Sequence, residues 1–493
     1  MSDLSNTFCA SFSQLVRVRV LLAALAFLFC LSATENTFAA NFIVTRTDDR
    51  NTTCNSGVDC SLREAVNAAN AAATNDTITF AAGLTTITLT NEIIINNNGT
   101  LTITGNGANV FTIDGGAGTN RIFTNLATTI ISGATLTGGN GMGANFPNFI
   151  GGAIFTGNSL TLDSVHITGN SSSSSSGGGV YFGGGTHSII NSTISGNTAN
   201  NCGGFNTESD ITVVNSTISG NTVPNSGNVG GGFCSQRGTT TLRNVTITNN
   251  TAGSGGGINI DFGATLNFGN TIVAGNTATG GSGAEIRFGT GTITSAGYNL
   301  VGDSAGDSTN TGNAITYQPT DILDINPMLG ALTITNGGTT PTHALQTGSP
   351  AIDKGNSFGL TTDQRGFARP FDNPSITNAT GGDGADIGAF EVQAAPTAAS
   401  VSIGGRVMTA SGRGIRNVYI TLTDSNGNNR LAVSTAFGYY RFEDVAAGET
   451  YIISASAKQY TFSQPTQVLN INEDADGINF IANSIKTVRG GRK

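Results

Sequence analysis

Apolar and polar positions in residues 151–300 repeat with a period of about 26 residues. Two markers follow this period: a short motif that ends in asparagine, and a glycine pair that precedes an apolar residue. The asparagines of the first marker are Asn170, Asn197, Asn221, Asn250 and Asn276. The apolar residues of the second marker are Ile154, Val180, Phe205, Phe233 and Ile258. A constant period of this length is typical of solenoids, in which each repeat stacks on its neighbour.

Between the markers, apolar and polar residues alternate with period two, which predicts short strands with apolar side chains facing a core. One apolar column contains Ile189, Val213, Leu242 and Phe268. A second contains Ile194, Ile218, Ile247 and Val273. Three strands and three turns fit one period at ~3.3 Å per residue, and stacking places equivalent residues ~4.8 Å apart. The pattern therefore predicts an all-β protein with a parallel β-solenoid over residues 77–320.

Asparagine recurs two positions after the first apolar column, at Asn191, Asn215, Asn244 and Asn270. We expect these side chains to point inward at a turn, with each amide donating to the asparagine of the next coil. Such a ladder satisfies polar groups that would otherwise be buried without partners.

The strand after each glycine pair carries the candidate binding residues. In a constant register, one outward column contains Phe155, Tyr181, Asn206, Cys234 and Asn259. The next outward column contains Glu208, Gln236 and Asp261. Phe155 and Tyr181 form either an aromatic platform for sugars or a surface ladder that only stabilises neighbouring strands.

Glu208 and Asp261 are the candidate catalytic pair. They lie two coils apart, or ~10 Å at the strand spacing, which is near the ~6.5–9.5 Å that separates the carboxylates of inverting glycosidases. The alternative is that both acids only face water. We prefer that alternative, because no paired aspartates and no cluster of lysine and arginine accompany them.

The repeats resemble the pectate-lyase-like superfamily, and they are similar to those of the chlamydial polymorphic outer-membrane proteins. This resemblance implies a right-handed parallel β-helix. The segment Cys60-Ser-Leu-Arg-Glu-Ala65 resembles the opening of bacterial surface β-helix proteins that carry the sequence CSLREA. Ser61 and Glu64 predict a capping box, and Leu62, Val66, Ala69 and Ala73 share one helical face. We expect residues 40–76 to cap the first coil.

Residues 321–392 are expected to form terminal coils and a second cap. Motifs such as Asp386-Ile-Gly-Ala-Phe-Glu391 resemble the closing region of the choice-of-anchor group. Residues 393–400 are a linker of small residues, and residues 401–483 alternate as the strands of a small β-sandwich. There, Thr435-Ala-Phe-Gly-Tyr-Tyr-Arg-Phe442 resembles the carboxypeptidase regulatory-like domain, which implies a transthyretin-like, carbohydrate-binding-like sandwich without peptidase chemistry. Residues 484–493 form a basic tail.

Residues 1–39 have the features of a signal peptide, with an apolar run from Val20 to Leu31 that is shorter than the ~20 residues of a membrane span. Export permits disulfides, and we predict one between Cys54 and Cys60. Cys202 and Cys234 differ by four positions in register, or ~13 Å along a strand. This separation argues against a bridge between them.

The composition of the chain excludes several classes of partner and site. Charged residues make up 11% of the chain, against roughly 25% in an average soluble protein, and the net charge of −9 disfavours nucleic acid as a partner. The histidine and cysteine spacings indicate no metal site and no cofactor.

We therefore expect an exported, monomeric, non-enzymatic protein outside the cell or on its surface, without a membrane span in the mature chain. It would recognise an extracellular glycan or protein through its β-helix faces. Two alternatives stay open: a polysaccharide lyase or glycoside hydrolase that uses Glu208 and Asp261, and a structural spacer that displays the sandwich.

Overall fold

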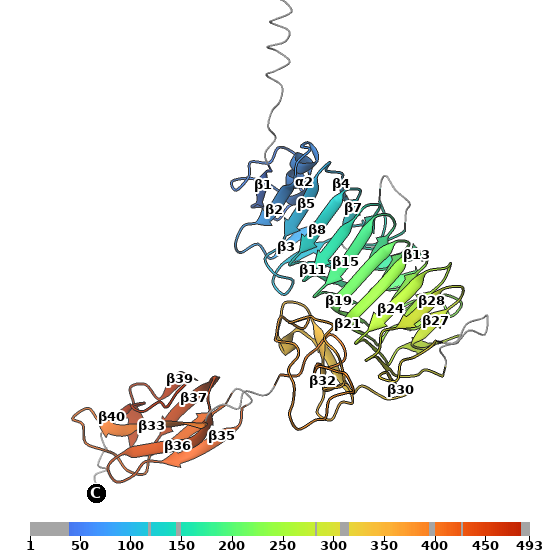
Figure 1. The fold of residues 1–493 in the computed structure, drawn as a ribbon. Helices are drawn as coiled ribbons and strands as arrows, with labels where there is room; N and C mark the ends of the chain where they lie inside the picture. The colour runs from blue at the N-terminus through green and yellow to red at the C-terminus, as the bar shows by residue number, and fades with distance from the viewer. Residues whose placement is uncertain are drawn as a thin grey trace, which may run out of the picture. The chain divides into compact units, whose positions relative to one another are not determined.

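Stacked parallel strands form the body of the first of two compact units, residues 1–392 and 393–493 (Figure 1). The computed structural model describes residues 39–116, 120–143, 149–281, 283–305, 315–393, 400–424 and 427–484. The predicted signal peptide lies outside the described residues except for Ala39, and so do most of the linker and residues 485–493 of the tail. In the described part, no helix combines the length and the apolar composition that crossing a bilayer requires.

One wall of the solenoid is a parallel sheet built from the strands that follow the glycine pairs. In spatial order among the described residues, its strands are β4 (Ile93–Ile95), β7 (Phe123–Asn125), β10 (Ile154–Thr156), β14 (Val180–Phe182), β18 (Phe205–Thr207), β20 (Phe233–Ser235), β23 (Ile258–Ile260) and β27 (Ile286–Phe288). Val180 pairs with Ile154 on one side and with Phe205 on the other. The second marker thus forms one continuous column, as its spacing predicts.

The other strands of the coils form a larger parallel sheet. Its described strands are β1 (Asn41–Val44), β2 (Asp76–Phe80), β3 (Thr86–Thr88), β5 (Thr100–Thr104), β6 (Thr112–Asp114), β8 (Thr128–Ser132), β9 (Thr135–Thr137), β11 (Leu160–Asp163), β12 (His166–Thr168), β15 (Thr186–Ile190), β16 (Thr193–Ser195), β19 (Asp210–Ser219), β21 (Thr239–Thr248), β24 (Thr265–Gly269), β25 (Ile272–Val273), β28 (Thr292–Ser295), β29 (Leu300–Val301) and β30 (Ile322–Leu323). Two short parallel pairs add β13 (Ser171–Ser176) with β17 (Thr198–Asn201), and β22 (Thr251–Ala252) with β26 (Thr277–Ala278). The pairing of Ile189 with Val213, and of Val213 with Leu242, confirms the predicted register.

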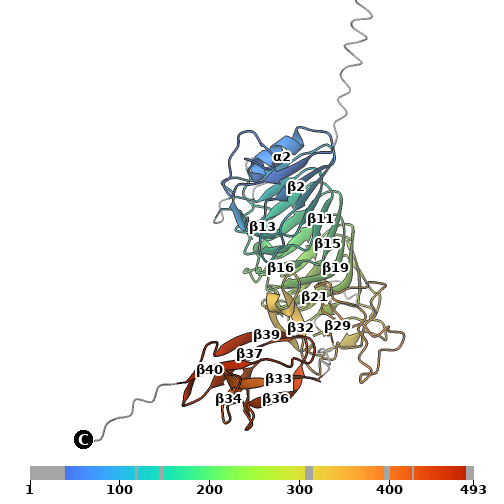
Figure 2. The same ribbon diagram turned by 90° about the vertical axis from the view of Figure 1, so that its left-hand side faces the viewer.

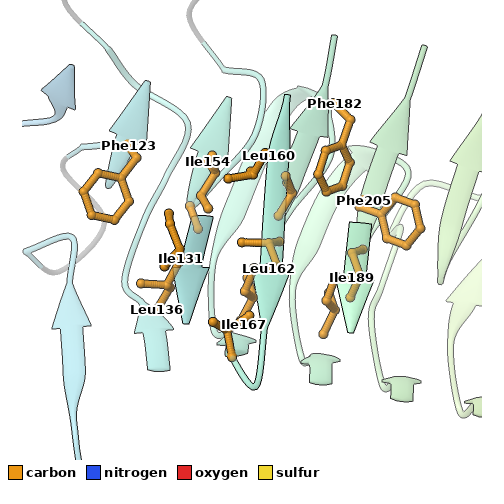
Figure 3. Packing of buried hydrophobic residues seen from close by; sticks show 14 of the residues in the cluster. Phe123, Ile131, Leu136, Ile154, Leu160, Leu162, Ile167, Phe182, Ile189 and Phe205 are labelled. Carbon is orange, nitrogen blue, oxygen red and sulfur yellow. The ribbon is translucent and has the colours of Figure 1, made fainter. Parts of the chain in front are cut away.

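The core is a stack of apolar side chains inside the coils. Figure 3 shows Phe182 and Phe205 on neighbouring strands, with Leu162 and Ile189 on the opposite wall. The rings of Phe205 and Phe233 are stacked, with centroids 4.7 Å apart. These side chains are fully buried, and each buried phenylalanine or branched aliphatic residue contributes about 1.5–3 kcal/mol. Buried apolar residues from Val44 to Val301 form one cluster, so the core extends along the whole solenoid.

An inward asparagine ladder runs through the solenoid, and it is built from the first repeat marker. Its members are Asn170, Asn197, Asn221, Asn250 and Asn276. Each of the first four amides donates to the Oδ1 of the next asparagine at 2.9–3.0 Å. The amide of Asn276 donates instead to the buried carboxylate of Glu285. All five asparagines are buried, so the ladder satisfies polar groups inside the coils.

The ladder predicted at Asn191, Asn215, Asn244 and Asn270 is therefore assigned to the wrong column. All four residues have positive φ, between +46° and +56°, a left-handed conformation that asparagine adopts more readily than most residues. Asn215 donates to the carbonyl of Thr362, and Asn244 to that of Ser357. The amide of Asn270 does donate to Asn244 Oδ1 at 2.7 Å, but it also donates to the carbonyl of Asp386. These turns are a contact surface for the C-terminal segment.

The helix α2 (Leu62–Asn70) lies at the N-terminal end of the solenoid, as Figure 2 shows. Ser61 and Glu64 form the predicted capping box. Hydrogen bonds with the Arg50 guanidinium hold the pKa of the Glu64 carboxyl far below its usual range. The predicted bridge between Cys54 and Cys60 is present. Ala73, expected on the apolar helix face, is exposed and lies beyond the end of the helix.

Residues 324–392, named here the lateral clasp, pack along the side of the coils. They contain β31 (Leu329–Thr333), the 3-10 helix η1 (Ile334–Asn336) and β32 (Thr342–Leu345). Further hydrogen bonds tie the clasp to separate coils, among them those from Thr193 Oγ1 to the carbonyl of Pro341, from Thr217 Oγ1 to Gln364 Oε1, and from the N–H of Ala389 to Thr246 Oγ1. Beyond β30, which pairs with β29, the described chain departs from the expected terminal coils. Polar side chains on the flank of the solenoid provide the bonds that hold the clasp there.

The second unit is a sandwich of two antiparallel-rich sheets. One sheet contains β36 (Tyr439–Ala446), β33 (Ser400–Thr409), β40 (Phe480–Ser484) and β38 (Tyr460–Phe462). The other contains β35 (Asn429–Val433), β34 (Tyr419–Thr423), β37 (Glu449–Ser456) and β39 (Thr466–Ile471). Ile403, Ile420 and Ile453 are fully buried between the sheets. The alternation in residues 401–483 thus predicts the sandwich.

Candidate functional site

The first candidate column lies in register but is covered. Tyr181 pairs with Phe155 on one strand and with Asn206 on the next, and the column continues through Cys234 and Asn259. Phe155 is 8% exposed, and Asn206 and Asn259 are at most 2% exposed. The predicted register is confirmed, whereas the expected exposure of this column is wrong for four of its five residues.

A disulfide between Cys202 and Cys234 covers part of this column and contradicts our expectation. Their Cα atoms are 5.2 Å apart. Cys202 has a φ of +56°, and the chain turns there, so that its Sγ lies 3.4 Å from Asn206 Oδ1. Gly230 has a φ of +75° on the next coil, where a Cβ would come 2.3 Å from Cys234 Sγ. Four positions therefore span a tight turn and not the ~13 Å of an extended strand.

Phe155 belongs to a buried cluster rather than to an exposed platform. The centroids of the Phe155 and Tyr181 rings are 6.0 Å apart. The guanidinium carbon of Arg121 lies 5.6 Å from the centroid of the Phe155 ring. Arg121 is fully buried and lies 3.3 Å from the Glu92 carboxylate. Half-buried Tyr181 donates its hydroxyl to the carboxylate of Glu208. Burial and this carboxylate hold the pKa of the Tyr181 phenol well above its usual value, so the hydroxyl stays a donor.

The second column forms a half-exposed row at the ends of these strands. The N–H groups of Glu208, Gln236 and Asp261 donate to the carbonyls of Phe182, Thr207 and Ser235, at 2.9–3.0 Å. Their side chains therefore lie on successive coils, one strand spacing apart. We name the row Tyr181, Glu208, Gln236, Asp261 and Arg287 the polar strip. Arg287 is a member that sequence reasoning missed, and its guanidinium lies 3.7 Å from the Asp261 carboxylate.

Phe262 adds an aromatic surface beside the polar strip. It follows Asp261 directly, is 69% exposed, and has a φ of +49° in a turn. Its N–H donates to Asp261 Oδ1 at 2.9 Å. The sequence Asp-Phe-Gly at 261–263 could have identified Phe262. Aspartate and glycine at this spacing are typical of a turn, and a side chain between them at a turn points into solvent.

The geometry of the polar strip favours hydrogen bonding to a ligand. Glu208 and Asp261 stand two coils apart with Gln236 between them, and each carboxylate has a partner side chain, Tyr181 or Arg287. Carboxylates and an amide in one row accept and donate hydrogen bonds at a fixed spacing. Among the described residues, no group of three or more histidine, cysteine or acidic side chains is placed to hold a metal ion.

A second candidate site is a groove of about 850 Å³ at one end of the sandwich. Loops before β34 and β36 and after β37 form its rim, and four cationic side chains line it: Arg406, Arg413, Arg416 and Lys458. Tyr419 and Phe437 face the same groove and are 53% and 72% exposed. The sequence motifs of this unit predict its fold but no role for these residues.

Residues 402–481 match the carboxypeptidase regulatory-like domain. The match covers the regulatory-like domain from β33 to β40, and it confirms the resemblance found at its Thr435–Phe442 motif. A comparison of the chain with curated proteins finds no match. The CSLREA-type and choice-of-anchor resemblances of the solenoid stay predictions.

Proposed function

We propose that this protein acts outside the cell, or on its surface, as a recognition protein whose solenoid binds a glycan or a protein along the polar strip. The observation that carries the proposal is the row of half-exposed Glu208, Gln236 and Asp261 on successive coils. The row continues the backbone hydrogen bonds of the sheet, so its spacing is set by the strands and not by mobile loops.

Preorganisation supports this function. The Tyr181 hydroxyl orients the Glu208 carboxylate, and Arg287 lies beside Asp261. A ligand then meets side chains whose freedom is already restricted, which lowers the entropic cost of binding. The exposed ring of Phe262 offers an apolar surface next to hydrogen-bonding groups, the combination that a sugar ring requires.

An extracellular location is supported by the two disulfides and by the predicted signal peptide. Cys54–Cys60 staples the N-terminal cap, and Cys202–Cys234 joins neighbouring coils. Structural disulfides persist in oxidising compartments and are rare in the cytosol.

The test is a glycan array and a protein-binding screen with the mature chain. The triple variant Glu208→Gln, Gln236→Ala, Asp261→Asn should lose at least ~10-fold in affinity, because its charged acceptors and central amide are removed. Asp303→Asn is the matched control, since Asp303 is an exposed acid of the same unit outside the strip. Equal binding by the triple variant and the control contradicts the proposal.

An activity assay with the same protein tests the enzyme alternative. Polysaccharides incubated with the protein are assayed for new reducing ends and for unsaturated products. Turnover that disappears in Glu208→Gln would replace recognition with lyase or hydrolase chemistry. If every ligand that the chain binds survives the triple variant and is lost in variants of the regulatory-like domain, the solenoid is instead a spacer.

A further inference from the structure

The regulatory-like domain collects positive charge at one end. Residues 400–483 contain six lysines and arginines and seven acids, a net charge of −1. Four of the six cations nevertheless line the single groove described above, together with no acidic residue. Three acids, Asp424, Asp444 and Glu449, and one cation, Arg430, line a separate cavity of about 280 Å³ at the opposite ends of the strands. The charge of this domain is therefore strongly polarised along the sandwich.

In the part of the chain that the structure describes, the groove cations have no acidic partners. Within the described residues, Arg406, Arg413, Arg416 and Lys458 form no ion pair. Arg441, outside the groove, differs because it pairs with Glu443 at 2.6 Å and with Asp476 at 3.1 Å. A concave surface lined by one sign of charge concentrates the opposite sign from solution.

The rim of the groove is held in place by backbone contacts. Arg406 donates its Nε–H to the carbonyl of Phe437 at 2.9 Å, and its guanidinium carbon lies 5.2 Å from the Tyr439 ring centroid. A Cβ on Gly414 would come 2.0 Å from the Phe437 carbonyl oxygen, so the two rim loops touch only because residue 414 is glycine. The backbone of Phe437 thus has a fixed position beside the cations, and its ring is exposed there.

We propose that this groove binds an acidic polysaccharide, with uronate carboxylates on Arg413, Arg416 and Lys458 and sugar rings against Phe437 and Tyr419. Arginine binds planar carboxylates through paired hydrogen bonds, and aromatic faces suit the apolar side of a sugar. The groove volume lies within the ~300–1,000 Å³ of small-ligand sites, enough for a short stretch of polymer. The net charge of −9 opposes polyphosphates, whose charge is denser. This site is independent of the polar strip.

Affinity electrophoresis and calorimetry on the full mature chain test the assignment with polygalacturonate. The fully methyl-esterified polymer is the ligand control, because it keeps the sugar backbone and loses the charge. We expect binding that weakens with salt and is at least ~10-fold weaker for the ester. The double variant Arg413→Gln, Arg416→Gln should lose at least ~10-fold in affinity, since it removes two groove cations.

Arg430→Gln, Arg441→Gln is the matched variant, because it removes the same charge from the same domain outside the groove. It should change affinity less than ~2-fold, since exposed charges away from a site contribute weakly. Phe437→Ala should weaken binding several-fold without altering the salt dependence, because it removes a ring and no charge. Circular dichroism of each variant confirms that the domain is folded.

Several outcomes would overturn the proposal. They are no binding to polygalacturonate at low salt, equal binding to the ester, equal losses in the two arginine pairs, and tighter binding to single-stranded DNA or to anionic phosphatidylglycerol vesicles. The polar-strip triple variant should still bind polygalacturonate normally. A failure of the strip proposal and a failure of the groove proposal are therefore distinguishable.

Discussion

Asn221 and Asn250 lie directly over each other on successive coils, and Nδ2 of Asn221 donates to Oδ1 of Asn250 at 2.9 Å. The same amide donates to the carbonyl of Ile194, while its oxygen accepts from both the backbone and the side chain of Asn197. Each ladder amide thus uses its donors and its acceptor inside a core from which water is excluded. The ladder is a polar seam that fixes the register of the coils.

Replacing Asn221 with alanine should lower the free energy of unfolding of the solenoid by about 3 kcal/mol. The substitution leaves two buried donors of Asn197 without their acceptor, and each such group costs about 1–3 kcal/mol. Urea denaturation followed by far-ultraviolet circular dichroism measures the change. Asn225→Ala in the exposed loop before β20 is the control, and its effect should stay within about 0.5 kcal/mol. Equal losses in the two variants would remove the special role of the ladder.

The register of the solenoid could be predicted from the sequence, but the direction of its asparagines could not. Both asparagine columns follow the same period, so spacing alone does not separate them. The two columns differ in backbone conformation. In the outward column the asparagines themselves, at 191, 215, 244 and 270, have positive φ. In the ladder column the residue before each asparagine has positive φ. That preceding residue is glycine at 169, 196, 220 and 275. In the outward column, only Asn270 follows a glycine, Gly269, so a Gly-Asn pair favours the inward column but does not identify it alone.

The solvent exposure of the candidate side chains also could not be predicted from the sequence. Alternation correctly places Phe155 and Asn206 outside the apolar core, yet both are buried. Phe155 packs against Arg121 and Tyr181, and Asn206 lies beside the turn at Cys202. Thr193 and Asn215 are covered by residues more than 140 positions later. Periodicity describes contacts between neighbouring coils, and it contains no information about a segment that folds back across several of them. Glu208 and Asp261 stay half-exposed, so they remain candidate site residues.

The Cys202–Cys234 bridge should stabilise the solenoid more than the Cys54–Cys60 bridge. It closes a separation of 32 residues rather than 6, and loop-closure entropy gives about 4 kcal/mol for the longer loop and about 2 for the shorter. The variant Cys202→Ala, Cys234→Ala should therefore have a lower urea midpoint than Cys54→Ala, Cys60→Ala. Peptide mapping without reductant verifies both bridges in the parent protein. A larger loss in the Cys54 pair would show that the cap limits stability.

Arg121→Met should destabilise the solenoid by about 3–5 kcal/mol, because it removes the cation beside the buried Glu92 carboxylate. Arg121 also donates to the Thr124 hydroxyl and to the carbonyl of Ile150. The double variant Glu92→Gln, Arg121→Met should recover part of this loss, since no buried negative charge then lacks its partner. Thermal melts of the three proteins at pH 7 test the order. A double variant no more stable than Arg121→Met would assign the loss to packing and backbone bonds.

Asp386 makes the stability of the lateral clasp depend on pH. It is 1% exposed, and its N–H donates to the Glu391 carboxylate at 3.0 Å. Burial and the charge of Glu391 raise the pKa of Asp386 to about 7. The nearby Arg369, which pairs with Glu391 at 2.8 Å, has a smaller effect that lowers this pKa. In the unfolded chain an aspartate has a pKa of about 3.9. Between these values the folded protein binds a proton that the unfolded chain has lost, so stability falls as the pH rises.

The expected loss from pH 5 to pH 8 is on the order of 2 kcal/mol. Asp386→Asn should flatten this dependence, because the amide is neutral throughout and can still accept from the N–H of Asp353. Urea titrations at both pH values, with hydrogen exchange at clasp amides, measure the effect. The exposed Asp303→Asn control should keep the parental slope. If Asp386→Asn also keeps it, the pH dependence arises elsewhere; if it flattens, the proton on Asp386 is part of what holds the clasp on the solenoid.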